Sequence, residues 1–128
     1  MNNNSGVWID HRKAVIVVLS GDAAATSRIA SEVQKHEHRD DVNDDTRQKE
    51  FTEHISRYYD RVIAALSGAG SILIMGPGEA KEELHKRFHH HRHDSRPIAV
   101  ETTAPMTEPE IAAKVRRHFH DDAPRIGV

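Results

Sequence analysis

The stretch SILIMGPGEAKEELHKRF, residues 71–88, carries the clearest structural signal in the sequence. Its first part, Ser71–Met75, is apolar at four consecutive positions, as is typical of a strand that is buried on both faces. Gly76-Pro77-Gly78 interrupts this run, and Glu79 opens a helix. The apolar stripe of that helix consists of Ala80, Leu84 and Phe88. The segment therefore predicts a strand, a tight turn and a helix in immediate succession.

Upstream of this segment, two β-branched runs predict a hairpin. Val7–Ile9 and Ala14–Leu19 are separated by the polar tetrad of residues 10–13. Ser20-Gly21-Asp22 then predicts a turn, and we expect a third strand over Ser27–Val33. Three strands in a row indicate an antiparallel meander at the start of the chain.

The connection to the central strand contains a polar stretch followed by a helix. Residues 35–49 show no apolar periodicity, which predicts a flexible loop. An amphipathic helix is expected from about residue 47 to residue 67, ended by Gly68. Its apolar positions recur at helical spacing and are Phe51, Ile55, Tyr58, Tyr59, Val62 and Leu66.

The C-terminal part predicts one more strand and one more helix. Ile98–Val100 is a short β-branched run, and Thr107 with Glu110 forms a Thr-x-x-Glu capping box at the start of the last helix. Residues 121–128 are expected to form a loose tail. The order β-β-β-α-β-α-β-α predicts a single α/β domain over residues 1–128, in which helices cover a mixed five-stranded sheet.

Composition excludes several classes of function. The 128 residues include no cysteine, so disulfides, thiolate metal sites and cysteine nucleophiles are excluded. No signal peptide is visible, and the longest apolar run, Ala14–Leu19, is too short to span a bilayer. We therefore expect a cytoplasmic protein without a membrane partner. The net charge of −2, with eleven histidines counted neutral, means that any phosphate-binding surface must be local.

The element order and the motifs within it resemble the ribonuclease H-like central domain of archaeal and eukaryotic peptide-chain release factors and of Pelota. The resemblance rests on the hairpin Val7–Val18, on the strand–turn–helix segment Ile72–Leu84 and on the long helix between them. It extends from about residue 6 to about residue 120. Bacteria carry stand-alone and fused versions of this domain, described as translational machinery proteins, and the sequence is most similar to those.

One departure from the family determines what the resemblance implies. Release factors carry Gly-Gly-Gln between the third strand and the first helix, whereas this chain has the acidic residues 36–45 there and no Gly-Gly-Gln anywhere. An acidic loop would be repelled by ribosomal RNA phosphates. The resemblance thus implies a non-catalytic module that contacts the ribosome, tRNA or another RNA, or a translation factor. It implies no cofactor and no hydrolysis of peptidyl-tRNA.

Two groups of residues are candidates for phosphate contact. The first is a set of basic side chains, which consists of Lys81, Lys86, Arg87, Arg92 and Arg96. Glu82, Glu83 and Asp94 lower the positive charge of this region, and a solvated charged face is the alternative interpretation. The second is the turn motif before the helix, where free backbone N–H groups can hold an anion: Gly76, Pro77, Gly78, Glu79 and Lys81. Because this turn lacks the Gly-Lys-Ser/Thr ending of a P-loop, a tight strand-to-helix connection is its simpler interpretation.

Metal binding is the remaining hypothesis. His85 and His89 share a helix face at i, i+4, the spacing at which two imidazoles hold one ion, with a solvated helix end as the alternative. Asp10 lies where ribonuclease H-like nucleases place a metal-binding carboxylate, and Glu101 is the one late partner. A metal-dependent phosphodiesterase or nuclease therefore stays open, as does a structural or stress-related homo-oligomer.

Overall fold

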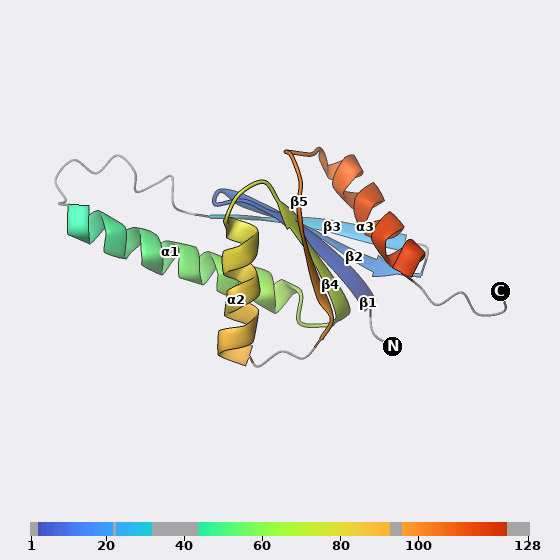
Figure 1. The fold of residues 1–128 in the computed structure, drawn as a ribbon, viewed down its shortest axis with the longest axis horizontal. Helices are drawn as coiled ribbons and strands as arrows, with labels where there is room; N and C mark the ends of the chain where they lie inside the picture. The colour runs from blue at the N-terminus through green and yellow to red at the C-terminus, as the bar shows by residue number, and fades with distance from the viewer. Residues whose placement is uncertain (1–2, 22, 32–43, 93–95, 123–128) are drawn as a thin grey trace.

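The computed structural model describes residues 3–21, 23–31, 44–92 and 96–122. In this part of the chain the elements follow the predicted order (Figure 1). They are β1 (Asn3–Ile9), β2 (Lys13–Ser20), β3 (Ala23–Ala30), α1 (Asp44–Ala65), β4 (Ala69–Gly76), α2 (Ala80–Arg92), β5 (Ile98–Thr102) and α3 (Glu108–Asp122). None of these helices is both long enough and apolar enough to cross a membrane.

The five strands form one mixed sheet in the order β3-β2-β1-β4-β5. β1 and β3 are antiparallel to β2, whereas β4 runs parallel to both β1 and β5. At the centre of the sheet, Val7 of β1 lies opposite Ile16 of β2 and Ile74 of β4. The predicted α/β fold with a mixed five-stranded sheet is therefore confirmed.

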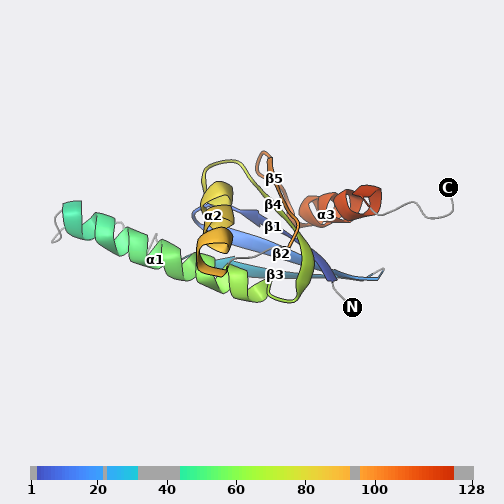
Figure 2. The same cartoon turned by 60° about the horizontal axis from the view of Figure 1, so that its bottom comes forward.

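Helices cover both faces of the sheet, as Figures 1 and 2 show. α1 and α2 pack on one face, over a core that includes Val7, Tyr58 and Phe88. α3 packs on the other face, over a core that includes Trp8 and Val115. Neighbouring residues of a strand point to opposite faces, so Val7 and Trp8 belong to different cores.

Two glycines permit close packing at the centre of the fold. A Cβ atom at Gly6 would collide with the side chain of Val115, so the missing side chain lets α3 approach β1. A Cβ atom at Gly76 would collide with the backbone carbonyl oxygen of Ile9. Gly76 therefore has a packing role between the ends of β4 and β1 in addition to its place in the turn.

The structure corrects the limits of two predicted elements. β3 spans Ala23–Ala30 instead of Ser27–Val33, because it pairs with β2 along its whole length, from Ala23 opposite Ser20 to Ala30 opposite Lys13. Its first residues are mostly alanines, which have a low strand propensity and give no signal in the sequence. α1 begins at Asp44, so residues 44–49 of the expected loop are helical. Residues 35–43 and the tail beyond Asp122 lie outside the described part of the chain.

The predicted capping box and the predicted apolar stripes of α1 and α2 agree with the structure except at one residue. The capping box of α3 is confirmed, since the Thr107 backbone N–H donates to Glu110 Oε1 (2.8 Å) and the Glu110 N–H donates to Thr107 Oγ1 (3.4 Å). Phe51 was expected in the buried stripe of α1 but is 37% exposed. The first turns of α1 extend beyond the sheet (Figures 1 and 2), and its buried positions begin at Ile55.

Candidate functional site

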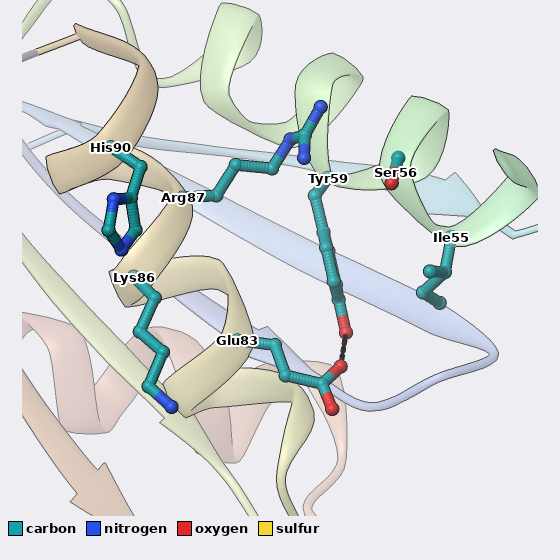
Figure 3. A pocket seen from close by; sticks show the side chains of 7 residues that line it. All are labelled: Ile55, Ser56, Tyr59, Glu83, Lys86, Arg87 and His90. Carbon is teal, nitrogen blue, oxygen red and sulfur yellow. Dashed lines mark hydrogen bonds between the residues drawn. The ribbon is translucent and has the colours of Figure 1, made fainter. Parts of the chain in front are cut away.

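A pocket lies where α1 and α2 face each other, and we call it the α1–α2 pocket (Figure 3). Its volume is about 330 Å³. α1 contributes Ile55, Ser56 and Tyr59, and α2 contributes Glu83, Lys86, Arg87 and His90. On α2, Glu83, Arg87 and His90 recur at helical spacing, so that packing of the two helices brings them to one side.

One side of the pocket is closed by hydrogen bonds to Glu83. The Tyr59 hydroxyl donates to Glu83 Oε1 at 2.5 Å, and His11 Nε2 from the β1–β2 turn lies 3.1 Å from the same oxygen. Burial raises the pKa of Tyr59, and the hydrogen bond to Glu83 raises it further. Tyr59 therefore remains a neutral donor, and the carboxylate of Glu83 is held in place between two elements.

Basic groups of α2 also line the pocket. Lys86 is exposed and, among the described residues, makes no hydrogen bond or ion pair. Arg87 forms a bidentate pair with Asp60 of α1, with Nε–Oδ1 and Nη2–Oδ2 distances of 2.7 and 3.0 Å. The hydrogen bond to Asp60 raises the pKa of Arg87. His90 also lines the pocket; no phosphate contact was predicted for it, although its i+4 spacing from Lys86 was the available signal.

The other predicted phosphate-binding residues have different surroundings. Lys81 is 5% exposed, and its ammonium group donates to the carbonyl oxygen of Gly78. Arg96 donates to the carbonyl oxygens of Leu66 and Ala69, both at 2.8 Å, and thereby closes the C-terminal end of α1. Arg92 is the last residue of α2, and its side chain lies outside the described part. Of the predicted set, the structure thus places Lys86 and Arg87 at the pocket.

The turn motif Gly76–Glu79 positions the start of α2. The Glu79 carbonyl oxygen accepts hydrogen bonds from the N–H groups of Glu82 and Glu83, both at 3.0 Å. Two carboxylates thus occupy the first turn of the helix, where they oppose the approach of an anion. This arrangement favours the tight connection over an anion site.

The carboxylates proposed for a nuclease are engaged in separate places. Asp10 Oδ1 accepts hydrogen bonds from the backbone N–H groups of Arg12 and Lys13, both at 2.8 Å, and so stabilises the hairpin turn. Glu101 pairs with Lys114 and His118 of α3, on the other face of the sheet. Within the described ranges, no group of three or more histidine, aspartate or glutamate side chains is arranged to hold a metal ion. The geometry gives no support to a two-metal nuclease.

The predicted histidine pair does come together on α2. His85 Nε2 and His89 Nε2 lie 3.1 Å apart. Partial burial lowers the pKa of His85, and the neighbouring His89 lowers it further. Two neutral or singly charged imidazoles are therefore favoured over a doubly protonated pair.

Comparison with known proteins gives structural relatives only. The sequence matches no protein-family model and no curated protein. Pelota from Thermoplasma acidophilum is similar over 95% of this chain and 33% of its own, with a TM-score of 0.55 and 18% identity. Pelota from Archaeoglobus fulgidus is similar over 91% and 31%, with a TM-score of 0.60 and 13% identity. An archaeal translation termination factor is similar over 94% and 39%, with a TM-score of 0.51 and 11% identity.

These likenesses define a class of fold. The chain spans between 31% and 39% of the length of the three similar proteins, so it corresponds to one part of each. At identities of 11–18% the likeness concerns the fold. The chain has the α/β fold of a domain that occurs in Pelota and in an archaeal translation termination factor, as its sequence motifs predicted.

Proposed function

We propose that this chain is a translation-associated binding module that contacts the ribosome, an RNA or a translation factor and does not hydrolyse peptidyl-tRNA. The supporting observation is a fold shared over 91–95% of the chain with Pelota and an archaeal translation termination factor. The lack of Gly-Gly-Gln supports the non-hydrolytic part of the proposal.

The α1–α2 pocket is the surface we assign to phosphate contact. Lys86 is exposed and free to reach a ligand, and Arg87 neutralises Asp60 beside it. Because the whole chain carries a net charge of −2, attraction to RNA depends on local cations such as Lys86. A backbone contact of this kind positions a module on RNA without reading its sequence.

Ribosome sedimentation tests the proposal. Tagged full-length protein from growing and starved cells is expected in ribosomal fractions and to leave them as salt is raised, because phosphate contacts weaken with salt. Absence from every ribosomal fraction under both conditions would refute the association.

Two matched variants test the assigned surface. Lys86→Glu and Arg117→Glu change the net charge equally, but Arg117 is an exposed residue of α3, on the other face of the sheet. Lys86→Glu should weaken sedimentation with ribosomes, whereas Arg117→Glu should leave it unchanged. If both variants sediment with ribosomes equally well, the contact lies outside the α1–α2 pocket. That result would not contradict the ribosome association itself.

A further inference from the structure

We propose that His85 and His89 of α2 form a binding site for one divalent transition-metal ion of the Zn²⁺, Ni²⁺ or Cu²⁺ type. The site is separate from the phosphate contact assigned above and does not depend on it. Both ligands come from one helix, so the site is complete within a single chain.

The distance between the two ring nitrogens fits chelation. His85 Nε2 and His89 Nε2 are 3.1 Å apart, and the ring planes are inclined by 64°. Two imidazole nitrogens at about 2.0–2.1 Å from one ion lie about 2.9 Å apart at a right angle and about 3.3 Å apart at the tetrahedral angle. The observed separation falls between these two geometries, so an ion can enter with only a small adjustment of the side chains.

The same two atoms are already in contact with each other. Without an ion, a contact of 3.1 Å between two Nε2 atoms requires one ring to donate its proton to the other. A metal ion takes the place of that proton and is bound by both Nε2 lone pairs. In a neutral pair the donor ring moves its proton from Nε2 to Nδ1, and in a singly charged pair the shared proton is released to solvent. His85 is half-buried and His89 is exposed, so the ion can arrive from solvent.

The helix that carries the ligands is fixed by packing. Leu84 and Phe88, which alternate with the two histidines along α2, are fully buried against the sheet. The backbone spacing of the ligands is therefore set before an ion binds, and little conformational entropy remains to be lost. Two protein ligands leave the other positions to water, so the site should bind its ion reversibly. Mg²⁺ and Ca²⁺, which prefer oxygen ligands, should not compete.

His90 provides a matched control within the same helix. It follows His89 directly but, unlike the two paired histidines, lines the α1–α2 pocket (Figure 3). The side chain of His91, and His93 as a whole, lie outside the described part of the chain. All test proteins should carry His91→Ala and His93→Ala, because a run of histidines chelates metals on its own.

Isothermal titration of NiCl₂ or ZnCl₂ into the full-length chain in this background is the test. We expect one ion per chain. His85→Ala and His89→Ala should each weaken binding by at least about tenfold, since loss of an outer-shell partner alone lowers metal affinity about 10–100-fold. His90→Ala should bind as the background protein does. Circular dichroism of each variant confirms that the fold is retained.

Nitrogen chemical shifts supply a second measurement. On addition of Zn²⁺, the Nε2 resonances of His85 and His89 should shift together, whereas the resonance of His90 should not. Unchanged affinity in the double variant His85→Ala/His89→Ala would overturn the proposal. An equal loss of affinity in His90→Ala would do the same, because it would show adventitious chelation along the helix.

Discussion

The two faces of the sheet differ in how they are covered, by α1 and α2 on one face and by α3 on the other. On the face that α1 and α2 share, the buried Tyr58 hydroxyl donates to the Asp10 carbonyl oxygen at 2.9 Å. On the face that α3 covers, the Trp8 indole N–H donates to the Ala104 carbonyl oxygen at 3.3 Å. α1 and α2 face each other on one side of the sheet, and the α1–α2 pocket lies at their junction. The described part of the face that α3 covers has no such junction between two helices.

Removal of a large side chain from the two-helix face should have the largest effect. Phe88 is fully buried, so Phe88→Ala should lower the free energy of unfolding by about 3–5 kcal/mol. Phe119 on α3 is only partly buried, and Phe119→Ala should cost clearly less. Urea unfolding monitored by circular dichroism measures both. Equal losses of unfolding free energy in the two variants would contradict the expected difference between the two faces.

Filling the close approach on the α3 face should have an intermediate effect. A methyl group at Gly6 collides with Val115, so Gly6→Ala should destabilise the fold by about 1–3 kcal/mol. The loss of stability caused by Gly6→Ala should be smaller in a Val115→Ala background, because the side chain that the new methyl group meets has been shortened. Gly68→Ala is the control, since a Cβ atom there meets nothing within 4 Å. An unchanged penalty in the Val115→Ala background would contradict the proposed contact.

Loss of one tyrosine hydroxyl should have the smallest effect at neutral pH. Tyr59→Phe removes the hydrogen bond to Glu83 and should cost about 0.5–1.5 kcal/mol. Burial raises the pKa of Tyr59 above its ordinary value of 10, so the unfolded chain releases this proton first as the pH rises. The unfolded state then binds fewer protons than the native state, and stability falls above about pH 10.

The pH dependence therefore gives this prediction a second measurement. Unfolding free energies of the wild type and of Tyr59→Phe, measured from pH 7 to pH 11, should converge above pH 10, because the variant has lost one titrating group. Parallel curves over the whole range would show that Tyr59 is not responsible for the decline.

Patterns over a few residues predicted local structure well. The capping box at Thr107, the stripe Ala80–Leu84–Phe88 and the hairpin before Val18 all appear in the structure, because each depends on neighbours within about four residues or on strict alternation. The start of β3 was missed since pairing with β2, not its alanines, makes it a strand. Arg96 was predicted to contact phosphate, yet it donates to the carbonyl oxygens of Ala69 and Leu66, 27 and 30 residues away in the sequence. No local pattern encodes such a partner.

The sequence by itself determined the order of the elements, the apolar faces of the helices and the spacing of His85 and His89. These follow from the fixed periods of the helix and the strand, which every chain obeys. Tertiary structure alone decided that Lys81 is buried while Lys86 is exposed, and that His11 and Tyr59 both reach Glu83. Side-chain direction depends on which surfaces pack together, and packing joins residues far apart in the chain.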